Sequence, residues 1–270
     1  MQHNSNCTII EGGRRTRGFT RTPRPEQPVI SIITVVYNGA RHIENAIKSV
    51  LGQCYENVEY IIIDGASTDN TLEIIRRYDD QIDYWLSEPD QGISDAFNKG
   101  VFHCHGKIIG TLNADDSYLP NILRLVAKTL ITGEEDQILH GSMIGVWSNK
   151  STVIRPRPCP KLYVYFDTPY FHSTTFIPAS IYEKIGRYDP EYGYAMDYDL
   201  FLRAQKAGVK FHEINAAITR YSFEGKSGSN PLSAYREVLK SQRRNGLFYP
   251  LCLTTYMLKT LANRLKKFLF

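Results

Sequence analysis

The chain has 270 residues, of which 42% are hydrophobic and 22% are charged, and its formal net charge is +4. This composition excludes a disordered, collagen-like or coiled-coil protein, and the length suits one large α/β domain or two small domains. The charge is too small to imply a specific nucleic-acid partner. The five scattered cysteines form no C-x-x-C pair, which argues against a disulfide framework or structural zinc and favours a cytoplasmic protein.

The first segment, residues 1–27, contains GGRRTRGFTRTPRP, which is basic, lacks apolar periodicity and predicts a flexible arm. From residue 28 the pattern changes, because VISIITVVYN and VEYIIIDG are β-branched runs typical of strands buried on both faces. A helical stretch separates them, and the β-α-β alternation continues to KIIGTLNADD. We therefore predict an α/β domain over residues 28–230, with a Rossmann-like, mainly parallel sheet flanked by helices and a ligand site at the carboxyl ends of its strands.

The last segment, residues 231–270, is predicted to be an amphipathic helical tail. Its apolar positions share one face, opposite the basic side chains, and include Leu261, Leu265, Phe268 and Leu269. This pattern is typical of a helix on an anionic membrane surface, although a helix docked on its own domain or on a second subunit has the same pattern. The longest apolar tract spans about twelve residues, whereas a transmembrane helix needs ~20, so we expect no membrane span.

Acidic residues follow the predicted strands. Asp64 ends VEYIIIDG, and Asp115 and Asp116 follow IIGTLNA. Adjacent carboxylates repel each other unless a cation neutralises them, and a divalent ion shared with a diphosphate does so. The first strand-to-helix turn, VVYNGARHI, lacks G-x-G-x-x-G, which argues against a dinucleotide. The alternative is structural: the aspartate pair would form a turn or helix cap, and Asp64 would cap the turn from Gly65 to Thr68.

Five motifs, taken in order, resemble the family 2 inverting glycosyltransferases with the GT-A fold: SIITVVYN, IIIDGASTDNT, EPDQGISDAFNKG, GTLNADDSYLP and AMDYDLFLR. The likeness runs from about Val29 to Ser229, and the chain looks like the bacterial members that build polysaccharide or lipopolysaccharide side chains. The resemblance implies a nucleotide-sugar donor and Mn²⁺ or Mg²⁺ as cofactor. The donor contacts that it implies are Val35, Tyr37, Asp64, Asp90, Asp95, Asn98, Asn113 and Asp115.

Within this set, the resemblance assigns Tyr37 and Asp64 to the nucleotide base. Tyr37 would stack on the base or lie at its edge, although it could equally cover the end of the sheet. Asp95 and Asn98 would contact the sugar or the nucleotide, but their spacing is also that of any solvated helix face.

The resemblance assigns Asp115 and Asp116 to the ribose and the metal ion. Asn113 stands where many relatives have another aspartate. An amide forms hydrogen bonds but adds no charge, so Asn113 would contact the ribose and would be a poor metal ligand.

The motif AMDYDLFLR opens a predicted helix, and the resemblance makes Asp197 the general base. Met196 stands where the family pattern usually carries Glu. Asp199 points away from Asp197 on a helix, so we expect it to pair with Arg203 or to bind the acceptor. Helix capping is the structural alternative for both aspartates. Further candidates for acceptor or diphosphate contacts are His172 in PYFHSTTF and Lys226 in FEGKSGSNP.

These features predict an inverting, metal-dependent hexosyl- or N-acetylhexosaminyl-transferase. The donor would be a nucleoside diphosphate sugar, with UDP expected because it is the commonest in the family, and the acceptor a hydroxyl of a growing glycan or lipid-linked acceptor. Two alternatives remain: a nucleotidyltransferase that makes a sugar nucleotide, and a non-catalytic protein that binds anionic membrane or nucleic acid. The nucleotidyltransferase would need a loop rich in glycine and basic residues after the first strand, and VVYNGARH is poor in both kinds of residue.

Overall fold

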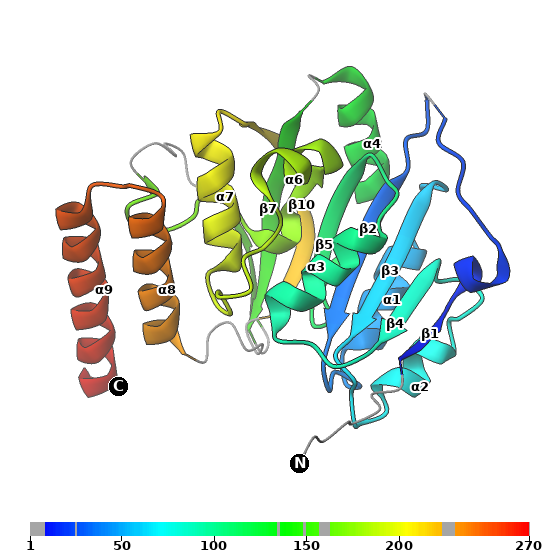
Figure 1. Cartoon of the computed structure of the whole chain (residues 1–270), viewed down its shortest axis with the longest axis horizontal. Coiled ribbons are helices and arrows are strands. Elements are labelled where there is room, and N and C mark those ends of the chain that lie inside the picture. Colours follow the sequence, from blue (N-terminus) through cyan, green and yellow to red (C-terminus); the bar gives the residue numbers. More distant parts are fainter. Residues whose placement is uncertain are drawn as a thin grey trace, which may run out of the picture.

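The computed structural model describes residues 9–24, 26–133, 136–147, 150–156, 163–222 and 230–269. Within these residues the strands form one ten-stranded sheet in the order β1-β4-β3-β2-β5-β9-β7-β10-β6, with β8 paired to β7. Helices cover both faces of the sheet, and two further helices extend from one end of the molecule (Figure 1).

The centre of the sheet is parallel. Its four strands are β2 (Ile30–Val36), β3 (Val58–Asp64), β4 (Tyr84–Ser87) and β5 (Ile108–Asn113). β2 and β3 are buried along their whole length, as expected for β-branched strands covered on both faces. In register, Val36 lies beside Asp64 and Val35 beside Asn113, so the carboxyl ends of these strands meet at one edge.

Two hydrophobic cores lie on opposite faces of this sheet. On one face, α1 (Ile43–Leu51), α2 (Thr71–Arg76) and α4 (Ile122–Thr132) pack against Ile30, Ile32 and Ile62. On the other face, α3 (Ile93–His103), α6 (Ala179–Ile185) and α7 (Met196–Lys206) pack against Ile33 and Ile61. This second layer lies in front of the sheet in Figure 1. Met196 is buried in this second core.

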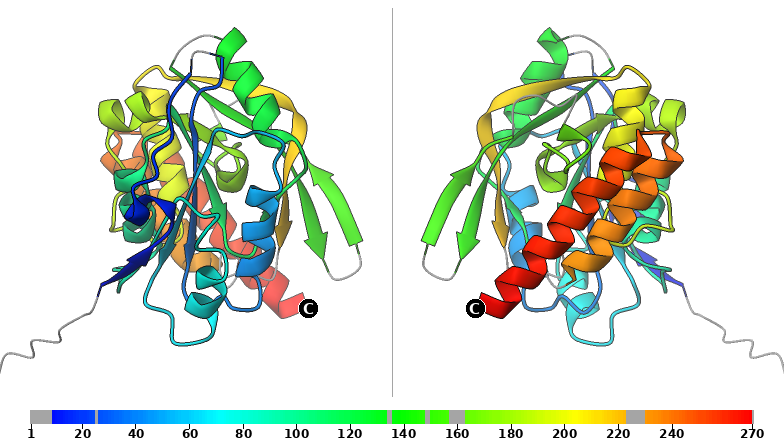
Figure 2. Two further views of the ribbon diagram at one scale, coloured as in Figure 1. Left: turned by 90° about the vertical axis from the view of Figure 1, so that its right-hand side faces the viewer. Right: turned by 90° about the vertical axis from the view of Figure 1, so that its left-hand side faces the viewer.

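The rest of the sheet is mixed. Its strands are β9 (Phe176–Pro178), β7 (Gln137–Trp147), β10 (Lys210–Ser222), β6 (Ser117–Tyr118) and β8 (Lys150–Ile154). β9 runs antiparallel to both β5 and β7, whereas β7 and β10 are parallel. β7 and β8 form an antiparallel pair that projects from the body of the molecule (Figure 2).

The N-terminal segment differs from the predicted flexible arm. β1 (Ile10–Gly12) pairs with the edge strand β4, and the short helix η1 (Arg14–Arg17) follows it. Arg21 donates through Nε and Nη2 to the carboxylate of Asp83 at 2.9 and 3.1 Å, and Asp83 is only 1% exposed. A buried carboxylate needs a partner, and the arm supplies it. The local pattern of the arm contains no sign of this distant partner.

The C-terminal tail forms two helices, α8 (Pro231–Arg244) and α9 (Tyr249–Leu269). α8 packs on α7, and α9 packs on α8 at the end of the molecule (Figures 1 and 2). The inner side of α9 is held by Cys252, which is buried, and by Thr255, whose hydroxyl donates to the Tyr165 carbonyl at 2.8 Å. Among the helices of the described ranges, none has the length and apolar character that a transmembrane span requires.

Candidate donor and catalytic site

Two loops at the carboxyl edge of the sheet are joined by hydrogen bonds. The backbone N–H of Asn38 donates to Ser67 Oγ, and the N–H of Thr68 donates to Asn38 Oδ1, both at 2.8 Å. The N–H of Ala40 donates to Asp69 Oδ2 at 3.1 Å. Asn38 has φ 51°, a left-handed conformation that asparagine tolerates better than most residues. The turns after β2 and β3 therefore hold each other in place.

Asp64 lies at the end of β3 and is completely buried. Its carboxylate accepts hydrogen bonds from the Ser67 N–H at 3.1 Å, from the Ser67 hydroxyl, and from the Ser87 hydroxyl at 2.6 Å. These donors enclose the group that the resemblance assigned to the base. The alternative expectation, that Asp64 caps the turn from Gly65 to Thr68, describes this geometry better.

Tyr37 follows β2 and is 52% exposed at the same edge. A Cβ atom added to Gly65 would lie 2.4 Å from Asp90 Oδ2 and 3.4 Å from Tyr37 Cδ2, so the aromatic ring and the carboxylate both crowd against this glycine. An exposed ring provides a stacking surface, and a neighbouring carboxylate accepts hydrogen bonds from N–H groups. Tyr37 and Asp90 together have the chemistry needed to hold a nucleotide base.

The acidic pair after β5 has one buried and one accessible member. Asp116 is 2% exposed and accepts hydrogen bonds from Asn113 Nδ2 and the Ser222 N–H, both at 3.2 Å. Burial, helped by the charge of Asp115, raises the pKa of Asp116 to about 8. Asp115 is half-buried, and burial also raises its pKa, with His42 acting in the opposite direction. A cation beside the pair would remove this electrostatic penalty.

The residues after β5 fit a divalent ion that is shared with a substrate. In the described part of the chain, no three His, Cys, Asp or Glu side chains cluster closely enough to hold a metal on their own. Mg²⁺ typically binds one or two carboxylates and takes its remaining ligands from water and substrate phosphates. Asp115 is the accessible carboxylate that would bind the ion directly, with the buried Asp116 behind it, and a diphosphate would supply further ligands.

Asp197 lies in the first turn of α7, where the free backbone N–H groups favour a carboxylate. It accepts a hydrogen bond from the Tyr198 N–H at 2.7 Å. Burial raises the pKa of Asp197 to about 6, the Tyr198 N–H lowers it, and the charges of Asp167 and Glu237 raise it further. The group is therefore mostly ionised at pH 7 but remains close to its pKa, as a general base requires.

A short segment connects the acidic pair to Asp197. Ser173 is near enough to Asp116 to lower the pKa of that carboxyl, and His172 Nε2 lies 3.1 Å from the Tyr188 hydroxyl. The charge of Asp197 in turn contributes to the raised pKa of Tyr188. A series of neighbouring residues therefore runs from the acidic pair after β5, through the segment before β9, to the start of α7. Sequence reasoning missed Tyr188, because nothing in its local pattern marks it.

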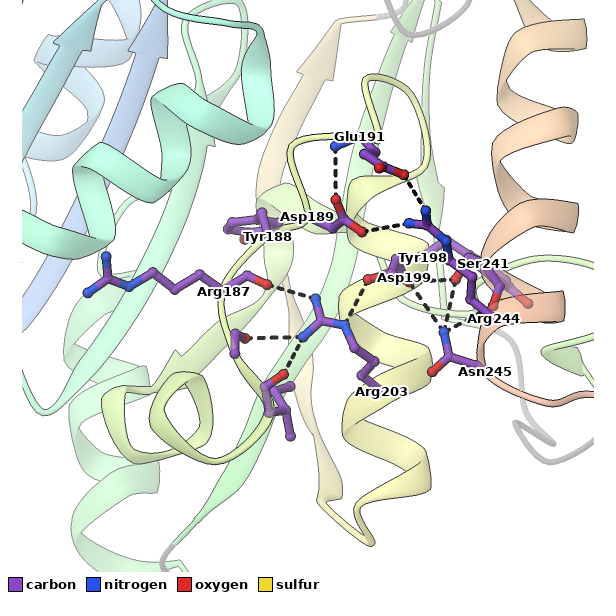
Figure 3. Close-up of polar contacts among 12 residues, drawn as sticks. Arg187, Tyr188, Asp189, Glu191, Tyr198, Asp199, Arg203, Ser241, Arg244 and Asn245 are labelled. Atoms are coloured by element: carbon purple, nitrogen blue, oxygen red, sulfur yellow. Dashed lines mark hydrogen bonds and ion pairs between the residues drawn. The ribbon is translucent and has the colours of Figure 1, made fainter.

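His172 and Asp199 are engaged within the protein. Burial lowers the pKa of His172 to about 4, so at pH 7 its ring is neutral and cannot pair with a diphosphate as a cation. Asp199 is 3% exposed and accepts hydrogen bonds from Arg203 Nε at 2.8 Å, Ser241 Oγ at 2.7 Å and Asn245 Nδ2 at 3.3 Å (Figure 3). The expected pairing with Arg203 is present, and both carboxylate oxygens of Asp199 accept hydrogen bonds from the protein.

Asn98, Asp95 and Val35 also contact other parts of the protein. The amide of Asn98 donates to the Tyr188 carbonyl at 2.8 Å and accepts from the Tyr188 N–H at 3.0 Å. Asp95 accepts from the Gln91 N–H at 3.0 Å and lies 3.3 Å from Lys99 Nζ. Both residues line a groove of about 510 Å³ between β1, β4 and α3. Val35 is buried in the core, so its side chain cannot reach a donor. Lys226 lies outside the described residues.

Asp64→Asn separates the structural role of this carboxylate from a role in base binding. Because the amide cannot accept all three hydrogen bonds, we expect the free energy of unfolding to fall by about 2 kcal/mol. Urea denaturation measures this change. Asp90→Asn, at the more open position beside Gly65, should cost less than about 1 kcal/mol. Unchanged stability of Asp64→Asn, together with weakened nucleotide binding, would contradict the structural role.

Comparison with known sequences shows the family. The model for "Glycosyl transferase family 2" matches residues 31–186. An uncharacterized glycosyltransferase of Rickettsia typhi is 31% identical over 199 residues, which cover 69% of this chain and 62% of the relative. One from Rickettsia prowazekii is 33% identical over 186 residues, covering 65% and 58%. The matched region thus spans about three fifths of the length of these relatives.

Comparison with solved structures confirms the predicted fold. Residues 1–349 of TarS from S. aureus, solved with UDP-GlcNAc, superpose with a TM-score of 0.63 at 16% identity, covering 84% of this chain and 70% of that one. The mannosyltransferase PcManGT from Pyrobaculum calidifontis, solved with GDP-Man and Mn²⁺, gives 0.61 at 17% identity, covering 92% and 79%. With the GT-A-like fold and the family match both in place, this chain belongs to glycosyl transferase family 2.

Proposed function

We propose that the chain is an inverting, metal-dependent glycosyltransferase. It transfers a hexosyl or N-acetylhexosaminyl group from a nucleoside diphosphate donor to a hydroxyl group. The proposal is supported by the segment that contains His172 and Ser173: Ser173 neighbours Asp116 of the acidic pair, and His172 contacts Tyr188, whose pKa is affected by the charge of Asp197. Asp197 itself is a carboxylate with a raised pKa. The acidic pair suits a diphosphate with its cation, and Asp197 suits the removal of a proton.

The donor lies along the carboxyl edge of the sheet. Tyr37 stacks on the base, Asp90 accepts its N–H groups, and Asn113 contacts the ribose. Asp115, with Asp116 behind it, would hold Mn²⁺ or Mg²⁺ beside the diphosphate. When bound, the ion offsets the negative charge that develops on the departing nucleoside diphosphate.

Asp197 performs the proton transfer. The acceptor hydroxyl has a pKa far above 7, so its proton must leave as the oxygen attacks the anomeric carbon. The proton passes to Asp197 while the new C–O bond forms and the bond to the diphosphate oxygen breaks. Attack from the side opposite the leaving group inverts the anomeric configuration.

The relatives support a nucleotide-sugar donor but leave its base open. TarS has been solved with UDP and with UDP-GlcNAc, and PcManGT with GDP-Man and Mn²⁺. At 16–17% identity these structures share the fold with this chain. We propose UDP because it is the commonest donor nucleotide in the family that the motifs resemble.

The outer face of α9 is proposed to lie on an anionic membrane at the cytoplasmic surface. Met257, Leu258, Leu261 and Leu265 are each more than half exposed on this helix. Residues 231–270 contain eight basic residues and one acidic residue, against 24 and 27 in the rest of the chain. An exposed apolar stripe within a basic segment suits anionic lipid headgroups. A lipid-linked glycan of the polysaccharide or lipopolysaccharide type is the acceptor that this position suits.

The alternative of a nucleic-acid-binding arm loses its main support. Arg15 lies 3.4 Å from Glu59, and Arg17 pairs with Asp79 and Asp80. Together with Arg21 on Asp83, these contacts neutralise most of the arm's positive charge within the domain.

Asp197→Asn removes the proposed base. We expect the turnover number to fall about 10²–10⁴-fold, the usual contribution of general base catalysis, while donor binding stays nearly unchanged. In the unaltered enzyme, kcat/KM should fall as pH drops below about 6, because the base must be ionised. Release of UDP or GDP from a panel of sugar nucleotides with Mn²⁺ measures turnover, and thermal shift measures donor binding. Unchanged turnover in the variant would refute the assignment.

Asp115→Asn removes the more accessible carboxylate of the metal site. We expect Mn²⁺ to lose most of its enhancement of the thermal shift produced by UDP, because an amide is a weak ligand for hard cations. Asp80→Asn, which alters a carboxylate that is 94% exposed on the far loop, is the matched control and should respond as the unaltered protein does. An equal response in all three proteins would exclude a metal at Asp115.

The double variant Leu258→Asp and Leu261→Asp tests the α9 face. We expect its binding to vesicles rich in phosphatidylglycerol to weaken at least tenfold, because two negative charges replace leucine side chains that would be buried in the lipid. Ile131→Asp, at an exposed apolar position on α4, is the control. If vesicles bind both variants equally, or if the double variant instead abolishes a dimer, the membrane proposal fails.

A further inference from the structure

One face of α8 contacts the segment that leads into the catalytic helix. Its contacting residues recur at helical spacing and are Glu237, Lys240, Ser241 and Arg244. Lys240 Nζ and Arg244 Nη2 lie 2.6 and 2.5 Å from Glu191, and Arg244 Nη1 lies 3.1 Å from Asp189. Ser241 donates to Asp199 on α7 itself. Figure 3 shows the contacts of Arg244 with the loop before α7 and the contact of Ser241 with Asp199 on α7.

Glu237 contacts the backbone immediately before α7. Its carboxylate accepts three successive backbone hydrogen bonds, from the N–H groups of Gly193 at 3.1 Å, Tyr194 at 2.7 Å and Ala195 at 2.8 Å. Ala195 is the N-cap residue of α7, and it has no side chain able to cap the helix. Exposed N–H groups at a helix start need acceptors, and a carboxylate is favoured there by the helix dipole. A distant residue therefore holds the N-cap residue of α7 and the two residues before it.

We propose that Glu237 is a positioning residue for the transfer reaction. By holding the backbone from Gly193 to Ala195, it fixes the start of α7 and thereby the direction in which the Asp197 carboxylate points. Asp197 lies only two residues beyond the held segment, so a shift of this backbone moves the base directly. The inference rests on the proposed role of Asp197 as general base.

The charge of Glu237 has a second effect on the same group. Asp167 from the segment before β9 and Glu237 from α8 are the acidic residues that face Asp197, and both favour its protonated form. Tyr188 approaches from the loop before α7, and Asp199 on α7 is paired with Arg203. Removing the charge of Glu237 should therefore move the acid limb of the pH profile to lower pH, a change that a purely structural contact would not produce.

Two variants separate the hydrogen bonds from the charge. Glu237→Gln keeps one acceptor oxygen and removes the charge, whereas Glu237→Ala removes both. Glu191→Gln is the matched control, because it removes an exposed carboxylate that links the same segment to α8 without accepting hydrogen bonds from the backbone of α7. Hydrogen exchange of the amides of residues 193–195 in the protein alone reports the contact without any substrate.

For Glu237→Ala we expect at least tenfold faster exchange at residues 193–195, and kcat reduced about 10- to 100-fold with the donor KM within threefold of normal. The assay follows UDP release from UDP-GlcNAc, or GDP release from GDP-mannose, with Mn²⁺. Glu237→Gln should keep more of kcat than Glu237→Ala and should move the acid limb downward. Glu191→Gln should match the unaltered protein.

The outcomes distinguish a failure of the positioning role of Glu237 from a failure of the proposed function. Unchanged exchange in Glu237→Ala refutes the backbone contact, and faster exchange with unchanged kcat refutes its role in positioning. An equal loss of kcat in Glu191→Gln would also refute it, because the effect would then belong to the whole interface. An unaltered protein that turns over no sugar nucleotide, yet shows the expected exchange, contradicts the proposed function rather than the contact.

Discussion

The site depends on one kind of interaction: carboxylates that accept hydrogen bonds from backbone N–H groups of neighbouring loops. Asp64 accepts from residue 67, Asp69 from residue 40, Asp116 from residue 222 and Glu237 from residues 193–195. A buried carboxylate without donors is costly, and a backbone N–H without an acceptor is costly too, so each pairing removes both penalties. These contacts fix the loops that extend beyond the strand ends, where the sheet itself imposes no order.

This interaction also divides the acidic residues by role. The carboxylate oxygens of Asp64 and Asp199 are occupied by donors from the protein, so these two residues stabilise the loops and helices around the site. Asp115 retains an accessible carboxylate, and Asp197 accepts one backbone hydrogen bond from Tyr198. Residues that could contact a substrate therefore lie beside saturated ones of the same chemical type. A functional assignment by residue type alone cannot separate the two groups.

The C-terminal tail joins the two halves of the proposed function. The inner helix α8 holds the backbone before α7, the helix that carries the proposed base, and α9 presents its apolar side outward. The single acidic residue of this basic segment is Glu237, and it is the one that holds the backbone leading into α7. A lipid surface that contacts α9 would therefore lie next to α8, the helix that packs against α7 and its proposed base.

The sequence by itself determined the β-α-β order and the parallel centre of the sheet, because β-branched runs such as Ile30–Val36 and the helical stripe of α1 are local patterns set by burial. The order of its motifs also identified the family. The sequence also placed Asp197 at a helix start. Only the tertiary structure decided that Arg21 neutralises Asp83, that Asp199 is saturated and that Glu237 holds the backbone before a helix some forty residues away. Periodicity reports which face of an element is buried, whereas the partner of a charged group is chosen by chain segments that meet only after folding.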